Sequence, residues 1–289
     1  MRVILKLAAV SCVIALLAAS VWAQQYRVTV GPLVDNGKIY GVWKRAPHSK
    51  GTHTLDNVLI KDVSITCRDD CLEIEDGSGP VTVQGGTWRH VGPPEKISAA
   101  FTNQNGNLIL DGVTVVGSYD PMVKPNIRFP NTDGVMAAQR TFLTVKGGSF
   151  SNFWDASIDT KATTKLTGTV TLASSGVSLK VWGHTTAENI VSRNPRRGHI
   201  SCLRSPAVAC DLHIKKLVAY DSNPNGLLVG FQGSNTTVRI DACELHVRPT
   251  MRMQWTKPGV TGTKLILGPT CENNGKVVVY PAVATSIVR

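Results

Sequence analysis

LTVKGGSF, residues 143–150, is one copy of a phrase that recurs along this chain of 289 residues. In each copy two or three apolar residues stand at alternate positions, a Gly or Asp usually follows, and another alternating pair closes the phrase. Most steps between copies measure about 20 to 28 residues, and a fixed period in that range indicates a solenoid. The other copies, from residue 58 onward, read VLIKDVSI, VTVQGGTW, LILDGVTV, KLTGTVTL, TAENIVS, LHIKKLVA, VRIDACEL and KLILGPTC.

A second phrase lies between the copies of the first, so each repeat carries at least two short strands. Its residues alternate in polarity and are joined by Gly, Asn, Asp and Pro, which is typical of strands and turns. Strands this short cannot bury a face alone, but stacked coils enclose a continuous apolar interior. The copies of this second phrase read DDCLEIE, SAAFTNQ, TDGVMAA, DASIDTK, GVSLKVW, GHISCL, NGLLVGF and MRMQW.

The repeats predict an all-β fold, namely a single-domain, right-handed parallel β-helix of about nine coils over residues 56–289. A β-sandwich is the alternative, because it also has short strands at regular spacing. The in-phase double repeat favours coils over hairpins. Residues 24–55 are less regular. We expect them to form a lead-in strand and a cap over the first coil, whose core and strand edge are otherwise exposed.

The first 23 residues have the pattern of a secretory signal peptide. Arg2 and Lys6 supply the charged region, residues 7–17 the apolar region, and residues 21–23 the cleavage site. The apolar run is short for spanning a bilayer, and no later run approaches that length. We therefore expect a soluble mature chain with no transmembrane segment, secreted or periplasmic.

The chain is basic, with 31 Lys and Arg against 20 Asp and Glu and a formal net charge of +11. A basic exported protein favours an acidic partner, and we expect an acidic polysaccharide or another polyanionic glycan. Aromatic residues are few and no basic helix or nucleic-acid motif is present, so nucleic acid is not expected. We expect a monomer.

Loops that lead from the first phrase into the second emerge along one edge of a solenoid, which is often the binding edge. This predicted rim is basic. The alternative is a solvated face without a binding role, which is common for surface Lys and Arg. Within the rim we take Lys124, Arg128, Arg193 and Arg196 as substrate-binding candidates. The full rim comprises Arg68, Arg89, His90, Lys96, Lys124, Arg128, Arg193, Arg196 and Arg197.

The cysteines predict three disulfides in an oxidising compartment. Of the seven, Cys12 lies in the predicted signal peptide, which leaves an even number. Cys243 and Cys271 hold equivalent places in successive coils, where stacked side chains lie about 4.8 Å apart. Zinc is the competing interpretation, but the spacings lack a matching His. The predicted pairs are Cys67–Cys71, Cys202–Cys210 and Cys243–Cys271.

The second phrase predicts a cluster of polar side chains on the outside of the coils. If Leu72, Val135, Ile158, Leu179 and then Ile200 or Cys202 point inward, their neighbours point outward. Coil stacking then places Asp159 beside Lys180, with Lys161 and Trp182 next to them. Asp133 and Asp155, near the starts of their strands, stack on the loop edge. Ser201 or His199 is the outward neighbour one coil later. The predicted cluster is Asp133, Asp155, Asp159, Lys161, Lys180, Trp182, Arg197 and His199.

Two reactions would use such a cluster. Hydrolysis of a glycosidic bond needs a carboxylic acid and a carboxylate, for which Asp155 and Asp159 are candidates with Asp133 as a third. Elimination from a uronate needs a base and positive charge that stabilises the intermediate. Lys161 or Lys180 is the candidate base, if neighbouring cations lower its pKa. Arg197 is the candidate neutralising group, and His199 is a further catalytic candidate.

Several of these residues have simpler interpretations. Asp is common at coil corners, where its side chain satisfies backbone donors. Asp159 with Lys180 is also consistent with an ordinary surface ion pair of little energetic value. His199 is also consistent with a hydrogen-bonded turn histidine. Trp182 fits exterior packing as well as a platform for a sugar ring. A Ca²⁺ held by Asp133 and Asp155 would supply part of the positive charge for elimination.

Over about residues 55–280 the chain resembles the pectin-lyase-like right-handed parallel β-helix superfamily. Residues 131–134, N-T-D-G, match a phrase of polygalacturonase-type hydrolases. Residues 68–71, R-D-D-C, resemble their Q-D-D-C, and residues 198–200, G-H-I, resemble part of their G-H-G. Residues 155–161 resemble a coil of β-helix polysaccharide lyases, which carry acidic Ca²⁺ ligands and a Lys or Arg base. The resemblance implies a polysaccharide lyase or a glycoside hydrolase.

We therefore expect an exported protein that binds and cleaves an acidic, uronate-containing polysaccharide by lyase or glycoside hydrolase chemistry. The alternative is a non-catalytic carbohydrate-binding or surface-adhesion solenoid.

Overall fold

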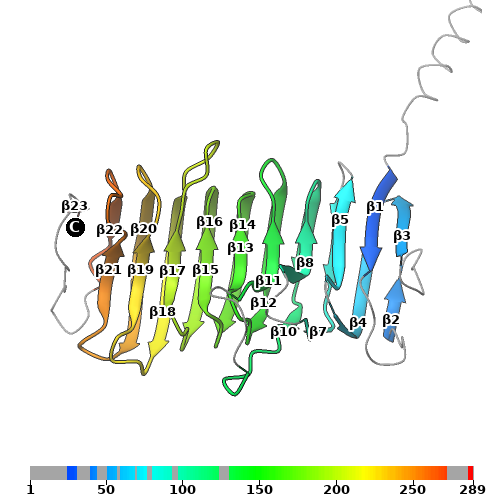
Figure 1. The fold of residues 1–289 in the computed structure, drawn as a ribbon, viewed down its shortest axis with the longest axis horizontal. Helices are drawn as coiled ribbons and strands as arrows, with labels where there is room; N and C mark the ends of the chain where they lie inside the picture. Colours follow the sequence, from blue (N-terminus) through cyan, green and yellow to red (C-terminus); the bar gives the residue numbers. More distant parts are fainter. Residues whose placement is uncertain are drawn as a thin grey trace, which may run out of the picture.

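Two long β-sheets contain all of the regular structure in the described part of the chain. The structure is a computed structural model, and it describes residues 25–30, 40–43, 51–56, 59–68, 70–76, 80–92, 97–123, 130–271 and 286–288. Within these ranges every regular element is a strand. The chain passes from one sheet to the other and back, and each return adds a parallel strand. Figure 1 shows the strands stacked side by side along the long axis of the molecule.

The second phrase of the repeat forms the ten-stranded sheet, called sheet A here. Its neighbours run parallel from β5 to β21, which excludes an antiparallel β-sandwich. The parallel strands are β5 (Leu72–Asp76), β8 (Ser98–Asn103), β11 (Thr132–Ala137), β13 (Ala156–Thr160), β15 (Val177–Val181), β17 (Gly198–Cys202), β19 (Leu227–Phe231) and β21 (Arg252–Thr256).

The first phrase forms the thirteen-stranded sheet, called sheet B here. Its parallel strands are β4 (Leu59–Cys67), β6 (Pro80–Gln84), β7 (Thr87–His90), β9 (Asn107–Asp111), β10 (Thr114–Val116), β12 (Phe142–Ser151), β14 (Thr163–Ala173), β16 (His184–Arg193), β18 (Asp211–Asp221), β20 (Thr237–Val247), β22 (Lys264–Leu267) and β23 (Ser286–Val288).

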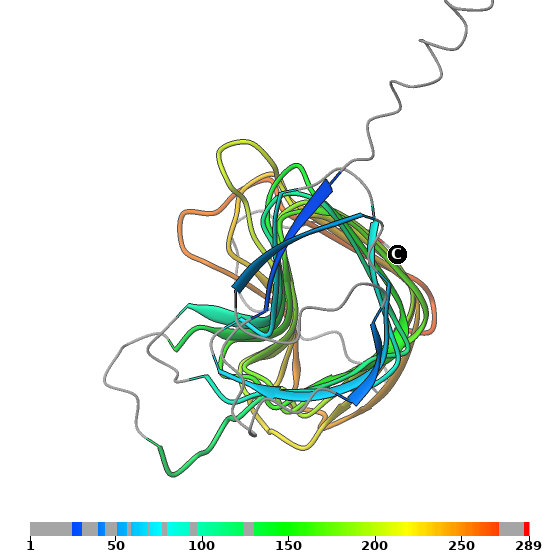
Figure 2. The ribbon, with the colours of Figure 1, turned by 90° about the vertical axis from the view of Figure 1, so that its right-hand side faces the viewer.

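The Gly or Asp at the centre of the first phrase forms a corner in several of the coils. Gly112, Gly147 and Gly168 have positive φ angles of 64°, 67° and 64°, and Asp62 has 51°. Glycine adopts this conformation without the steric penalty of a Cβ atom. The corner turns the coil, so the chain winds around a central interior when viewed along the long axis (Figure 2).

Two strands near the N-terminus, β1 (Gln25–Val30) and β2 (Tyr40–Trp43), run against the direction of the others. β1 pairs antiparallel with β5 and with β3 (Gly51–Asp56) at one end of sheet A. β2 pairs antiparallel with β4 of sheet B. The predicted signal peptide lies outside the described residues. Among the residues that are described, no helix is long and apolar enough to cross a membrane.

The core is a set of apolar columns between the sheets. Val135, Ile158, Leu179, Ile200 and Val229 are paired from one coil to the next and are all buried. This register confirms the predicted inward column, including Leu72 at its start and Cys202 two residues beyond Ile200. The three predicted disulfides, Cys67–Cys71, Cys202–Cys210 and Cys243–Cys271, are present.

Candidate functional site

The outer face of sheet A carries the predicted acidic and basic side chains in one place. Asp159 on β13 is paired in register with Lys180 on β15, and Lys180 with Ser201 on β17. The Lys180 Nζ lies 2.6 Å from Asp159 Oδ2. This contact confirms the predicted juxtaposition, which follows from the two-residue alternation of parallel strands.

Asp155, directly before β13, is held between two cations. Lys180 Nζ donates to its Oδ2 at 2.7 Å, and Arg197 Nη2 donates to its Oδ1. Arg197 comes from the second coil along, so it reaches across Gly176. A Cβ at Gly176 would lie 2.5 Å from that Arg197 nitrogen and 2.5 Å from the Asp155 carbonyl oxygen. The missing side chain of Gly176 is therefore what lets Arg197 reach Asp155.

Asp133 on β11 completes a group of three carboxylates. One oxygen from each of Asp133, Asp155 and Asp159 lies within 4.8 Å of the other two. Asp133 Oδ1 accepts a hydrogen bond from the Ala156 N–H at 2.7 Å. Its Oδ2 is buried and has no hydrogen-bond partner among the described residues. An unpartnered buried oxygen is costly when ionised, so Asp133 favours its protonated form.

The three-dimensional arrangement drives the pKa values in this group apart. Burial raises the pKa of Asp133 well above 3.8, and the neighbouring Asp159 and Asp155 raise it further. Burial also acts to raise the pKa of Asp155, but Lys180 and Arg197 outweigh it and hold that pKa below 3.8. Burial acts to lower the pKa of Lys180, yet Asp159 and Asp155 outweigh it and raise that pKa above 10.5. The cluster thus opposes ionisation of Asp133 and favours the charged forms of Asp155 and Lys180.

Trp182 and Lys161 lie beside the carboxylates, as predicted. The Trp182 Nε1–H donates to Asp159 Oδ1 at 2.8 Å. Lys161 Nζ lies 5.2 Å and Lys180 Nζ 5.8 Å from the centre of the Trp182 ring, within the range of cation–π attraction. Trp182 is therefore fixed by its indole N–H, with its ring next to two ammonium groups.

The carboxylate group fits a resident Ca²⁺ poorly. Calcium takes six to eight oxygen ligands, and these must be free of competing cations. Here the Lys180 ammonium already lies within hydrogen-bonding distance of both Asp155 and Asp159. The negative charge of Asp155 and Asp159 is instead balanced by Lys180 and Arg197.

His199 does not join the cluster, and the expectation that it is a catalytic residue on the outer face is corrected. Its side chain is buried, with Nδ1 2.6 Å from Ser192 Oγ and Nε2 3.5 Å from Asp221 Oδ2. Ser201 holds the outward position beside Lys180 instead. The buried residues Ile200 and His199 are consecutive, so strict alternation fails at the start of β17.

The other rim candidates have different outcomes. Arg196 donates to the carbonyl oxygens of Ser174, Phe153 and Trp154, and burial lowers its pKa to about 10. It braces the corner before β13 through backbone groups. The Arg193 guanidinium lies over the Tyr220 ring of sheet B, with its Cζ 4.0 Å from the ring centre. Its substrate-binding role stays a prediction.

The long insertion before β11 is anchored next to the cluster. Its Tyr119 packs edge-on against Trp154, with ring centres 4.7 Å apart, and Arg196 lies over the Tyr119 ring. Trp154 directly precedes Asp155, so the insertion begins at the edge of the site. Lys124 and Arg128, the two substrate-binding candidates in the insertion, lie outside the described residues.

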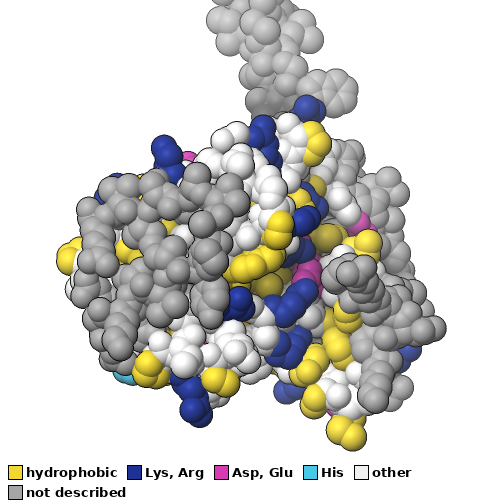
Figure 3. Space-filling model, turned by 60° about the vertical axis from the view of Figure 1, so that its left-hand side comes forward, with side chains coloured by type: hydrophobic (Ala, Val, Ile, Leu, Met, Phe, Trp, Pro, Cys, Tyr) yellow, Lys and Arg dark blue, Asp and Glu magenta, His cyan; other side chains and the backbone are white. Residues whose placement is uncertain are grey.

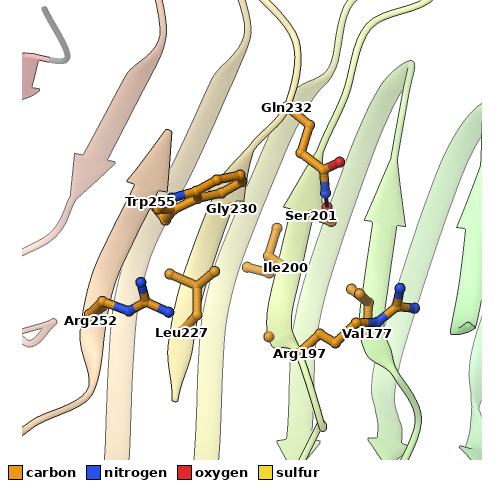
Figure 4. A pocket seen from close by; sticks show the side chains of 10 residues that line it. Val177, Arg197, Ile200, Ser201, Leu227, Gly230, Gln232, Arg252 and Trp255 are labelled. Carbon is orange, nitrogen blue, oxygen red and sulfur yellow. Dashed lines mark hydrogen bonds between the residues drawn. The ribbon is translucent and has the colours of Figure 1, made fainter. Parts of the chain in front are cut away.

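A pocket of about 250 Å³ opens on the same outer face, over β15 to β21. Of its lining residues, only Arg197 belongs to the cluster predicted from the sequence. The register that pairs Trp255 of the MRMQW phrase with Gly230 is the signal that could have indicated this pocket. On the face in Figure 3, Lys and Arg gather in a hollow around an acidic patch, with hydrophobic side chains to either side. Figure 4 shows the pocket, lined by Val177, Arg197, Gly198, Ile200, Ser201, Leu227, Gly230, Gln232, Arg252 and Trp255.

No protein-family model, curated protein or solved structure matches this chain. The function is therefore inferred from the chemistry of the outer face of sheet A.

Proposed function

We propose that this protein binds an acidic, uronate-containing polysaccharide across the outer face of sheet A and cleaves it at the Asp155–Asp159–Lys180 cluster. The observation that carries this proposal is the grouping of three carboxylates within 4.8 Å of one another, with Lys180 and Arg197 both donating to Asp155. This arrangement raises the pKa of the buried Asp133 and lowers that of Asp155. Environments that push carboxyl pKa values apart are how proteins obtain an acid and a base at the same pH. Lys180 and Arg197 supply the positive charge that attracts a uronate.

Hydrolysis is the reaction that this cluster supports best. It needs one proton for the leaving oxygen and one carboxylate to act on water or on the sugar. The three carboxylates lie within 4.8 Å of one another, close enough for their titrations to be coupled. Burial favours a proton on Asp133, while Lys180 and Arg197 favour the ionised form of Asp155. The raised pKa of Lys180 keeps its proton in place, which argues against the expectation that neighbouring cations turn this lysine into a base.

Elimination is the second candidate, with Lys161 as its base. Lys161 lies against Trp182 and has no ion pair with a carboxylate among the described residues. Its ammonium group is thus not committed to a carboxylate as that of Lys180 is, and in this reaction Lys180 and Arg197 would neutralise the uronate carboxylate.

Binding without cleavage is the third candidate. The Asp155 and Asp159 side chains are only 10% and 7% exposed, because Lys180 and Arg197 cover them. A substrate must displace part of this cover before either carboxylate can react.

We further infer that the solenoid is right-handed, with about nine coils, as a member of the pectin-lyase-like superfamily. Strand–crossover–parallel strand connections are right-handed in about 98% of cases, and each coil here is such a connection. Three disulfides in the described part of the chain support a secreted or periplasmic location. The monomeric state remains part of this proposal.

The test is an assay of the purified protein on polymers of galacturonate, glucuronate, mannuronate and guluronate. New reducing ends and near-ultraviolet absorbance of unsaturated products are measured in parallel. We expect reducing ends without unsaturation. We also expect Asp155→Asn and Asp159→Asn each to slow their release by at least about 100-fold, as for loss of an acid or base.

Asp211→Asn is the matched control, because Asp211 is an exposed carboxylate on sheet B and should leave the rate unchanged. Unsaturated products that disappear in Lys161→Ala would replace hydrolysis with elimination. If no polymer is cut, the proposal of cleavage fails. Salt-sensitive retention on one polymer would then support binding without cleavage.

A further inference from the structure

We propose that the pocket over β15 to β21 is a specificity site for a single anionic sugar ring. In this site Trp255 stacks on the ring and Arg252 binds its carboxylate. The inference rests on the proposed function, because it assigns the sugar unit next to the one that is cleaved. It concerns residues outside the carboxylate cluster, so it can fail independently.

The size of the pocket matches one ring. Its volume of about 250 Å³ lies just below the roughly 300 Å³ at which sites for drug-sized ligands begin. The floor owes its depth to Gly198 and Gly230, which stand on neighbouring strands and lack side chains. A Cβ at Gly230 would lie 3.9 Å from the Trp255 ring and 3.3 Å from the Leu227 side chain. The space above Gly230 is therefore bounded by the indole on one side and by Leu227 on the other.

The chemistry of the walls matches an acidic sugar. Trp255 is partly exposed, and Figure 4 shows its ring beside Gly230 with Arg252 and Leu227 below it. Opposite, the Gln232 amide donates to Ser201 Oγ at 2.7 Å, which fixes two polar groups suited to sugar hydroxyls. An aromatic face, a guanidinium and fixed hydroxyl partners together select a ring with one negative charge.

Arg197 joins the pocket to the cluster. It lines the pocket while its Nη2 pairs with Asp155, and its side chain is 48% exposed. A polymer that places one uronate in the pocket therefore passes Arg197 on its way to Lys180. The pocket thus sets which sugar unit lies beside the carboxylates.

The test uses sodium glucuronate and sodium galacturonate as probes, with glucose and methyl glucuronate ester as neutral controls. Binding is measured by calorimetry and by tryptophan fluorescence on the full chain. We expect a uronate to bind at least about tenfold more tightly than its neutral counterpart, because a charged hydrogen bond is lost. Equal affinity for glucose and for both uronates would overturn the proposal.

Arg252→Gln and Trp255→Leu should each weaken uronate binding at least about tenfold. Arg239→Gln, which removes an exposed arginine of sheet B, should leave binding unchanged. Gly230→Ala is a second route to the same result, because it adds only a methyl group inside the pocket and has an ordinary backbone conformation there. If all three pocket variants fold and bind uronate like Arg239→Gln, the pocket has no such role.

Asp159→Asn separates this inference from the proposed cleavage. It should abolish release of reducing ends while uronate still binds in the pocket. Cleavage with an unchanged KM in Arg252→Gln and Trp255→Leu would overturn the pocket and leave the proposed function standing. Uronate binding by a protein that cuts no polymer would support the pocket and overturn the proposed cleavage.

Discussion

Asp133 is the residue whose environment departs most from that of a surface carboxyl. It is buried, one of its oxygens has no hydrogen-bond partner among the described residues, and two further carboxylates lie within 4.8 Å. Each of these factors opposes its ionisation. A group whose pKa is raised in this way lowers the stability of the folded protein at neutral pH, where the unfolded chain ionises freely.

Asp133→Asn should therefore stabilise the protein at pH 7 by on the order of 1 to 3 kcal/mol. The amide keeps the oxygen that accepts from Ala156, and it has no proton to take up on folding, so the cost of protonating the carboxyl at pH 7 is removed. Below about pH 4 the carboxyl is protonated in both folded and unfolded states, so the gain should disappear there. Urea unfolding of both proteins from pH 3 to pH 8 measures the difference. A gain that does not depend on pH, or a loss of stability at pH 7, would contradict this account of Asp133.

At the scale of an element, the chain bends at the centre of each repeat phrase that forms sheet B. The bend has to leave the hydrogen bonds between neighbouring strands intact. Gly148 follows Gly147 at this point in β12, and its φ angle is 101°. A Cβ there would lie 2.5 Å from the Val113 carbonyl oxygen of the preceding coil. The double glycine therefore serves both the backbone conformation and the close approach of two coils.

Gly148→Ala should cost about 2 to 4 kcal/mol of folding free energy, through backbone strain together with the clash on Val113. Gly112→Ala is the matched control. Gly112 also has positive φ, at 64°, but a methyl group added there would have no other atom within 4 Å. It should cost only about 1 to 2 kcal/mol. Equal losses in thermal unfolding would show that coil contact plays no part.

These elements also show how much of the site could be predicted from the sequence. The alternation in DASIDTK and GVSLKVW places Ile158 and Leu179 inside, and the contact of Asp159 with Lys180 follows directly from it. His199 was misplaced by the same rule. The alternation in GHISC puts His199 and Ser201 on one face, but it fails at the start of β17, where His199 is buried against Ser192. The direct contact between Arg197 and Asp155 could not be predicted either, because it depends on the absence of a side chain at Gly176.

At the scale of the whole molecule, contacts run from each coil to its neighbours, so cross-links act locally. The disulfide Cys243–Cys271 joins successive coils near the C-terminal end, across 28 residues. Cys202–Cys210 and Cys67–Cys71 close loops of 8 and 4 residues within single turns. The chain-entropy model assigns more stabilisation to the longer closed loop.

Replacing both cysteines of a pair by serine should therefore rank the pairs by loop length. We expect a loss of about 3 to 4 kcal/mol for Cys243–Cys271 and about 2 kcal/mol for each of the shorter loops. Chemical denaturation of the three double variants measures the ranking. A larger loss for Cys67–Cys71 than for Cys243–Cys271 would show that the short loop stabilises the fold by a route other than chain entropy.

The absence of a side chain at Gly176, which lets Arg197 contact Asp155, has a consequence for how such a protein can evolve. Solenoids lengthen by duplication of a turn, and most positions along the axis accept one because each turn meets only its neighbours. Between Asp155 and Arg197 an added turn would carry the guanidinium about 4.8 Å further away, beyond the reach of a hydrogen bond. Insertion of a turn is thus excluded between the three coils that carry Asp155, Gly176 and Arg197.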